Sequence, residues 1–230
     1  MIRKTVVYIA ALTVALSLPV LITLTAVESI AFSEPFFLRQ HKLLKIEQDT
    51  GFTASDYQRF SRALWDYYLG RASSPQVFIP TDHGPKQPLY KDYELAHLAD
   101  VHHLFRSGVT VRNLAAMLFI SGIVLIIFPQ KKHRWRLIAS AIAAGSTGAI
   151  FLFALLLLAV QTNFNQAFTY FHYLSFDNML WQLDPATDNL IRLFPEQFFF
   201  NATVAIVMRA TAALVLLAAI SIVALYRKKS

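Results

Sequence analysis

The chain has 230 residues, of which 56% are hydrophobic and 15% charged, and it carries a net charge of +7. This composition is too apolar for an ordinary water-soluble domain, and the chain is too short for a large transporter. Because the chain contains no cysteine, disulfides, thiolate metal sites and a thiol nucleophile are excluded. A small protein with several membrane spans fits this composition best.

Four long apolar stretches follow one another along the chain. They cover residues 5–27, 113–130, 137–160 and 202–226. Each is about as long as the roughly 20 residues that a helix needs to cross a hydrocarbon core. The first stretch is longer than the apolar region of a secretory signal peptide, so we interpret it as a retained helix. The sequence therefore predicts a membrane α-helical fold with four transmembrane helices.

Short basic flanks at residues 1–4, 131–136 and 227–230 predict the orientation of these helices. None of the flanks contains an acidic residue, and the positive-inside rule assigns all three to the cytoplasm. Both termini are then cytoplasmic in a multi-pass membrane protein. Contact with anionic lipid headgroups accounts for these positive charges, so we expect no nucleic-acid partner.

This topology divides the chain into five segments. They are the first transmembrane helix (1–27), an extracytoplasmic cap (28–108), the second and third transmembrane helices with a cytoplasmic basic loop (109–160), an extracytoplasmic loop (161–201), and the fourth transmembrane helix with a cytoplasmic tail (202–230). We predict mixed α and some β structure for the cap. Thr53 or Ser55 can cap a helix, and turn residues between 73 and 90 indicate a loop or β-hairpin.

The stretch 93–108 is predicted to be a helix that leads into the second span. On such a helix His97 shares a face with Glu94 and Asp100, because residues three apart are neighbours on a helix surface. This arrangement places a titratable ring close to the membrane boundary, with two carboxylates nearby. Arg106 follows on the same helix.

The second extracytoplasmic segment carries aromatic residues of the kind found at membrane interfaces, among them Trp181. The sequence LDPATDNLI then predicts a turn and a short helix, with Asp184 at the helix start and Asp188 in its first turn. Arg209 lies inside the fourth apolar stretch. A charge at the centre of a span costs roughly 2.5 to 3.5 kcal/mol on insertion scales, so Arg209 needs a partner or access to water.

His97 and His172 are the histidines that fall near predicted membrane boundaries on the outer side. Either could be catalytic, or could simply bond a backbone carbonyl at the interface. A His-bound zinc site involving His97, His102 and His103 would make the protein a membrane metalloenzyme, but HLADVHH lacks the HExxH spacing. A non-enzymatic membrane sensor or scaffold is the other alternative. No G-x-S-x-G motif supports a serine acyl-enzyme.

Two motifs resemble those of the lipoprotein intramolecular transacylases (Lit), small four-span bacterial membrane proteins. One is E-x-x-H-x-x-D-V before the second span, and the other is FH…W…D…D-x-L-I…P-x-x-F-F before the fourth. The matching residues are Glu94, His97, Asp100, Val101, Phe171, His172, Trp181, Asp184, Asp188, Leu190, Ile191, Pro195, Phe198 and Phe199. Near Ser175 the match is looser, which affects the shape of the pocket more than the chemistry.

The resemblance implies an acyltransferase that moves the sn-2 acyl chain of a lipoprotein's diacylglyceryl-cysteine to the α-amino group of that cysteine, giving a lyso-form lipoprotein. It implies catalytic roles for His97 and His172. We expect Glu94 or Asp100 to orient His97. Trp181, Arg106 and Arg209 are the further candidates for supporting the site or binding substrate. The expected partners are diacylglyceryl-modified lipoproteins and membrane lipid, at an extracytoplasmic active site. We expect no cofactor and no metal.

Overall fold

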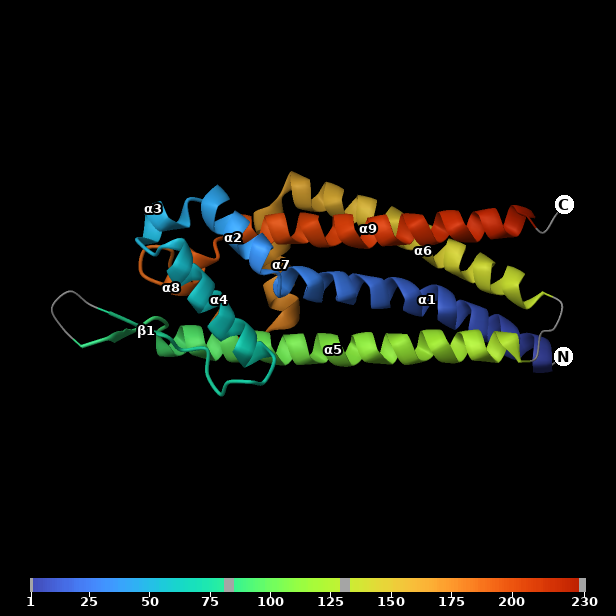
Figure 1. The fold of residues 1–230 in the computed structure, drawn as a ribbon, viewed down its shortest axis with the longest axis horizontal. Coiled ribbons are helices and arrows are strands. Elements are labelled where there is room, and N and C mark those ends of the chain that lie inside the picture. Colours follow the sequence, from blue (N-terminus) through green and yellow to red (C-terminus); the bar gives the residue numbers. More distant parts are fainter. Residues whose placement is uncertain (1, 81–84, 129–132, 228–230) are drawn as a thin grey trace. The chain divides into compact units, whose positions relative to one another are not determined.

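A computed structural model describes residues 2–80, 85–128 and 133–227 of the chain (Figure 1). Met1, Lys131, Lys132 and residues 228–230 of the basic flanks lie outside the described residues. The elements are α1 (Ile2–Ala31), α2 (Glu34–Leu43), α3 (Ile46–Thr50), α4 (Ala54–Tyr68), β1 (Phe78–Ile79), β2 (Gln87–Pro88), α5 (Asp92–Ile127), α6 (Arg134–Thr162), α7 (Phe164–Ser175), α8 (Asn189–Leu193) and α9 (Glu196–Arg227). The protein is therefore mostly helical.

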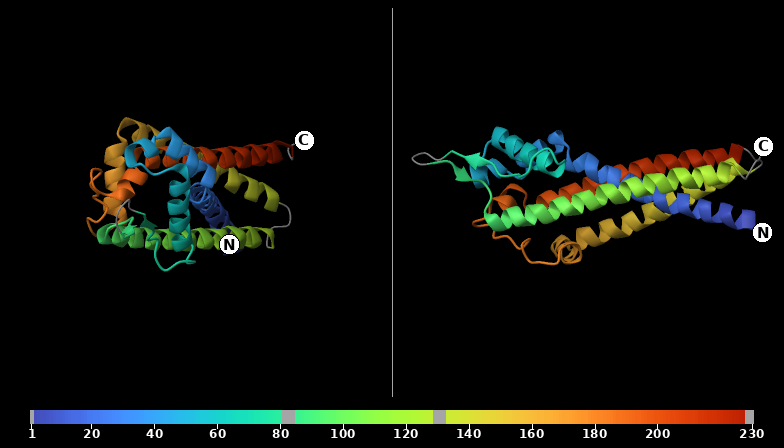
Figure 2. Two further views of the ribbon diagram at one scale, coloured as in Figure 1. Left: turned by 60° about the vertical axis from the view of Figure 1, so that its left-hand side comes forward. Right: turned by 90° about the horizontal axis from the view of Figure 1, so that it is seen from below.

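Within the described ranges, four helices are long and apolar enough to cross a membrane, which confirms the predicted number of spans. These helices are α1, α5, α6 and α9, and Figures 1 and 2 show them as long uninterrupted rods. The chain divides into two compact units. The membrane unit comprises residues 1–29, 108–161 and 204–230, and the cap unit comprises residues 30–107 and 162–203.

Glycines in the membrane unit allow close packing between helices. A Cβ at Gly145 of α6 would overlap the carbonyl oxygen of Ala15 on α1, and a Cβ at Gly122 of α5 would meet Val14 of α1. Small residues let backbones approach closely, which stabilises helix pairs in lipid by van der Waals contact. Val14 also belongs to a buried cluster that includes Ile126 and Ile138, so α1 packs against both α5 and α6.

Polar contacts between helices accompany this packing. Arg112 of α5 forms a salt bridge with Glu28 of α1. Arg209 of α9 donates from Nη1 to the backbone oxygen of Ser29 at 3.1 Å and to its hydroxyl at 2.9 Å. Arg209 thus has the polar partner that its place in an apolar helix requires.

The cap unit has its own hydrophobic core, which is rich in aromatic side chains. Phe37 of α2, Tyr57 of α4, and Phe194 and Phe198 near the start of α9 are all buried in one cluster. Their rings lie 5.1 to 6.4 Å apart in tilted and edge arrangements, which are the favoured geometries of aromatic pairs. This core holds segments distant in sequence in one compact unit.

Local sequence signals explain where the cap helices begin. Ser33 accepts a hydrogen bond from the Phe36 amide at the start of α2. Thr53 and Asp56 form a reciprocal capping box at the start of α4. Thr53 is therefore the cap, of the two residues that the sequence offered. β1 and β2 form a two-stranded antiparallel sheet, consistent with the predicted hairpin.

Two details of the second extracytoplasmic segment differ from the sequence prediction. The short helix α8 begins after Asp188, not after Asp184. The side chain of Asp184 instead closes a turn by accepting from the Ala186 amide at 2.9 Å. The sequence also did not predict α7 as a helix, although Asn163 caps it by accepting from the Gln166 amide. Aromatic residues in α7 pointed to the interface and obscured its helical spacing.

Candidate active site

The local sequence around the start of α5 fixes the position of His97. Glu94 lies in the first turn of this helix and accepts a hydrogen bond from the Lys91 amide at 2.8 Å. A carboxylate at this position satisfies an amide that the helix itself leaves unpaired. His97 follows one turn later and is buried, with 7% of its surface exposed.

His172 lies in the last turn of α7 and is also buried, with 6% exposed. Its Nδ1 lies 2.7 Å from the backbone oxygen of Phe168, one turn earlier. Because a carbonyl oxygen can only accept, Nδ1 carries the hydrogen. In the neutral ring the lone pair is then on Nε2, which leaves that nitrogen able to accept a proton.

The two histidines come together although 74 residues separate them in the sequence. Their ring centroids are 6.1 Å apart. The ring of Phe176, which follows α7, packs against both, at 5.2 Å from His97 and 5.6 Å from His172. The cap unit therefore contains a buried pair of imidazoles enclosed by an aromatic side chain, and Phe176 is a site residue that the sequence reasoning did not single out.

Trp181 completes the aromatic surroundings of His172. Its ring lies against the imidazole with centroids 4.8 Å apart and an interplanar angle of 31°. The Nε1 of Trp181 and the Nδ1 of His97 are buried and have no hydrogen-bond partner among the described residues. Buried polar atoms are normally paired, so these two atoms stand out within the aromatic surroundings of the pair.

Burial lowers the pKa of His172 below the usual value for histidine, because an apolar environment disfavours the charged ring. The bond to the Phe168 oxygen opposes this shift without cancelling it. The imidazole consequently stays neutral at neutral pH. A neutral ring is the form that can act as a base.

The two carboxylates near His97 bond to the segment that follows α7 instead of to the imidazole. Asp100 accepts from the side-chain amide of Asn178 at 2.9 Å. Glu94 is completely buried and accepts from the Leu190 amide at 2.7 Å. Both contacts tie the helix that carries His97 to the chain that carries His172 and Trp181, which explains how two distant segments are held in register.

Asp188 adds a third connection between the same segments. Its buried carboxylate accepts from Lys91 Nζ at 2.7 Å, from the Asp184 amide at 2.8 Å and from the hydroxyl of Tyr93. Burial alone would raise the pKa of Asp188, but the hydrogen bonds from Lys91 and Tyr93 outweigh it and hold that pKa well below its usual value. Asp188 is therefore ionised and cross-links the cap unit.

Within the cap unit, Arg106 does not join the histidine pair. Arg106 is exposed and follows His97 by nine residues on α5, which places it on the opposite side of the helix at about 100° per residue. Arg209 belongs to the membrane unit, where it bonds Ser29. His102 packs against Tyr67 with centroids 4.6 Å apart. Within the described ranges, no group of three or more histidine or acidic residues could hold a metal ion.

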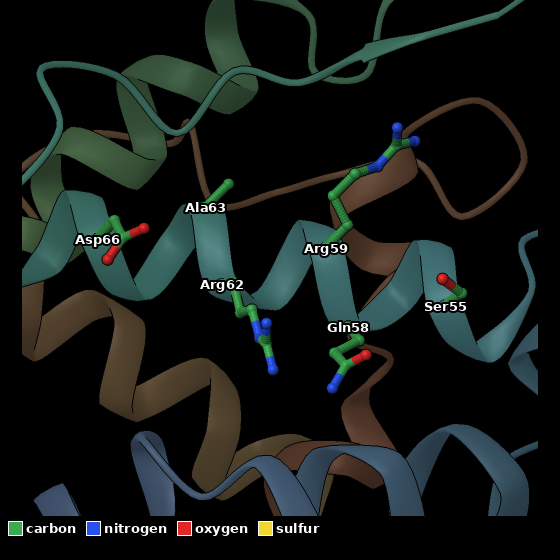
Figure 3. Close-up of a pocket in the computed structure, with 6 residues that line it drawn as sticks. All are labelled: Ser55, Gln58, Arg59, Arg62, Ala63 and Asp66. Atoms are coloured by element: carbon green, nitrogen blue, oxygen red, sulfur yellow. The ribbon is translucent and has the colours of Figure 1, made fainter.

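A pocket is present on the polar face of α4. Its lining residues are Ser55, Gln58, Arg59, Arg62, Ala63 and Asp66 (Figure 3). Gln58 and Arg62 point the same way from the helix in this view, and both donate to Glu34 of α2. The pocket thus lies beside an ion pair between α2 and α4 and contains none of the residues predicted to be catalytic.

Comparison with solved structures shows that this chain shares its fold with known membrane proteins. The membrane integral lipoprotein intramolecular transacylase Lit from Bacillus cereus is 20% identical, with a TM-score of 0.77 over 98% of this chain and 98% of that chain. A variant of that protein with a histidine-to-arginine substitution gives a TM-score of 0.75 at 20% identity, over 99% of this chain and 95% of that chain. At this identity the likeness shows the fold alone. No curated protein matches the chain.

The sequence itself matches a protein family over most of its length. Residues 12–199 match the family described as lipoprotein intramolecular transacylase Lit. This range includes two of the four candidate spans in full, most of the first span, and both histidines of the buried pair. The chain belongs to the lipoprotein intramolecular transacylase (Lit) family and is a membrane acyltransferase.

Proposed function

We propose that this enzyme moves the sn-2 acyl chain of a diacylglyceryl-cysteine lipoprotein to the α-amino group of the same cysteine. The product is a lyso-form lipoprotein. The observation that supports the chemistry most directly is the buried pair of imidazoles, His97 and His172, with centroids 6.1 Å apart. Family membership supplies the lipoprotein substrate class.

In this reaction a new amide bond forms as the ester bond breaks. An α-amino group has a pKa of about 7.7 to 8.0 and is mostly protonated at neutral pH, so it first releases one proton to solvent. The neutral nitrogen then loses a second proton to a base as it attacks the ester carbonyl. The neutral Nε2 of His172 fits that role, because its Nδ1 hydrogen is anchored on the Phe168 oxygen. The proton then passes to the glycerol oxygen as that oxygen leaves.

The tetrahedral intermediate carries a negative oxygen that needs a hydrogen-bond donor. His97 lies beside the base, and the indole N–H of Trp181 is buried without a partner in the described part of the chain. We assign to His97 the stabilisation of this developing charge as a hydrogen-bond donor, while His172 returns the proton to the glycerol oxygen. Trp181 supplies a second donor from the ring that covers His172.

No covalent enzyme intermediate is required. The nucleophile and the ester belong to one lipid-modified residue, and holding them together can provide a large part of the rate. A chain without cysteine can therefore transfer an acyl group by acid and base catalysis alone. Glu94, Asp100 and Asp188 contribute indirectly, because they hold the two histidine-bearing segments together.

We place the active site on the extracytoplasmic side of the bacterial cytoplasmic membrane. The basic flanks favour cytoplasmic termini by the positive-inside rule. With four spans, the cap unit then lies outside, where mature lipoprotein N-termini are exposed. Arg106 and Arg209 remain proposed contributors to substrate binding at this face.

The proposal is tested by replacing His97 and His172 separately with alanine in the purified enzyme and reading the N-terminus of a diacylglyceryl reporter lipoprotein by mass spectrometry. Loss of an acid or base catalyst lowers rates by about 100- to 10,000-fold, so each variant should leave the amine free. His103→Ala is the matched control, because His103 is exposed on the same helix as His97. Wild-type rates of lyso product in either test variant would rule the proposal out.

A further inference from the structure

The C-terminal half of α7 exposes a set of large apolar side chains. Tyr170, Phe171 and Tyr173 are 50 to 58% exposed, and Leu174 is 89% exposed. The neighbouring His172 faces the other way and is buried in the cap unit. Large apolar side chains gathered on one face of a water-exposed helix are unusual and indicate a binding surface.

The composition of this helix favours lipid as the occupant of that surface. The sequence FNQAFTYFHYLS contains no aspartate, glutamate, lysine or arginine. Two of the exposed side chains are tyrosines, which are enriched where a membrane meets water. A surface that binds a protein partner would normally include charged or polar residues, because protein interfaces have a polar rim.

Contacts within the cap unit hold α7 at the beginning of a membrane-spanning helix. Asn165 donates to Glu196 at 3.0 Å, and Glu196 is the first residue of the span formed by α9. Phe164 packs against Phe200 with centroids 5.4 Å apart, and Phe168 packs against Phe199 at 5.3 Å. The first two turns of a spanning helix lie at or near the membrane surface, so these contacts hold the first half of α7 close to that depth.

The connection to the preceding span leads to the same conclusion. The candidate span formed by α6 ends at Thr162, and α7 begins at Phe164. With a single residue between them, the chain has no length in which to move away from the bilayer. The first half of α7 is therefore tied to two membrane-crossing helices, to α6 by the chain and to α9 by side-chain contacts.

We propose that α7 is an interfacial helix that inserts its exposed face, formed by Tyr170, Phe171, Tyr173 and Leu174, among the lipids of the bilayer. A helix in this position lies in the plane of the interface, with its apolar side chains among the upper parts of the acyl chains. The opposite face presents His172 to the interior of the cap unit. The glycerol esters of a membrane lipid lie at the same depth, so insertion would bring an ester to the level of the imidazole.

The insertion itself does not depend on the proposed reaction and can be tested separately. Because the chain has no cysteine, Leu174→Cys and Phe171→Cys each create a single labelling site at an exposed position. Ser55→Cys is the control, since Ser55 is exposed on the polar face of α4. Each full-length variant is labelled with an environment-sensitive fluorophore and reconstituted into phosphatidylcholine and phosphatidylglycerol vesicles.

Two quenchers then distinguish lipid from water. We expect lipids with a nitroxide on the acyl chain to quench the label at positions 174 and 171, and aqueous iodide to quench it several-fold less than at position 55. Iodide quenching equal to that at position 55, with no quenching by nitroxide lipid, would overturn the proposal. That outcome would assign the apolar face to water or to a protein partner instead.

Discussion

At the scale of single residues, the hydrogen bond from His172 Nδ1 to the Phe168 oxygen determines which nitrogen can react. This bond leaves the Nε2 lone pair free in the neutral ring, and burial favours that neutral ring. An equivalent imidazole in water would be partly protonated at pH 6.5. The enclosed site therefore maintains a competent base over a wider range of acidity than an exposed histidine could.

This difference predicts the pH dependence of the reaction. Because the pKa of His172 is lowered, the base stays neutral as the pH falls and is lost only below the usual histidine range. The acid limb of the rate should instead follow the substrate amine, with a midpoint of about 7.7 to 8.0. Initial rates between pH 5 and 9, measured on a detergent-solubilised reporter, would contradict this if a second inflection occurred at or above about 6.5.

The indole of Trp181 offers a second prediction at this scale. In Trp181→Phe the aromatic surface against His172 is retained and the buried N–H donor is removed. Loss of one donor to a developing oxyanion lowers kcat by about 100- to 1,000-fold in well-studied enzymes. If Trp181 acts as proposed, kcat should fall while KM changes little. An unchanged kcat in a folded Trp181→Phe variant would limit Trp181 to packing.

At the scale of elements, α5 is connected to the segment after α7 by buried carboxylates. Asp188 has a lowered pKa, so it stabilises the fold above the unfolded pKa of about 3.9, and this contribution is lost as the pH falls through the lower folded value. Asp188→Ala also removes the shared acceptor of Lys91 and Tyr93, so the two segments lose this cross-link and the cap unit should become less stable.

Thermal unfolding in detergent tests the role of Asp188. The unfolding midpoint of Asp188→Ala should be lower than that of the wild type at pH 7, and the difference should shrink as the pH falls below about 4. Asp177→Ala is the matched control, because Asp177 is exposed on the preceding loop. A midpoint for Asp188→Ala equal to that of the control at pH 7 would mean that this cross-link does not stabilise the cap unit.

Packing of α6 on α1 gives another prediction at the scale of elements. Gly145→Ala forces a methyl group into the Ala15 carbonyl, and overpacking of this kind costs roughly 1 to 3 kcal/mol. Gly148 lies one turn away, and a Cβ there meets nothing within 4 Å. Gly148→Ala should therefore be neutral or slightly stabilising. Equal unfolding midpoints for the two variants in detergent would contradict the close approach of these helices.

At the scale of the whole molecule, the sequence predicted the spans well because each required only a long apolar run. The two histidines could be predicted as site residues for a related reason: both flank apolar runs, and the family motifs include them. Other contacts of the site could not be predicted from the sequence. Glu94 and Asp100 share a face with His97, as predicted, yet their partners are Leu190 and Asn178, which local spacing cannot reveal.

The helix α7 is a part of the fold that the sequence did not predict. Aromatic residues lie both on its exposed face and on the face that packs within the cap unit, so the sequence shows the aromatic character of a membrane interface more plainly than a helix. The contacts of Phe176 with both imidazoles depend on the direction in which the chain leaves this helix. Such a direction is set by packing between distant segments, and a single sequence contains no direct signal of it.

The position of the acyl chain on a reporter lipoprotein tests the central claim most directly. The protein would be expressed in a bacterial host that cannot N-acylate its lipoproteins. The N-terminal lipopeptide of the reporter would then be sequenced by tandem mass spectrometry. We predict one acyl chain on the cysteine α-amine and a single remaining ester on the glyceryl group. A diacylglyceryl-cysteine with a free amine, in cells that contain the folded protein in their membrane, would contradict the account.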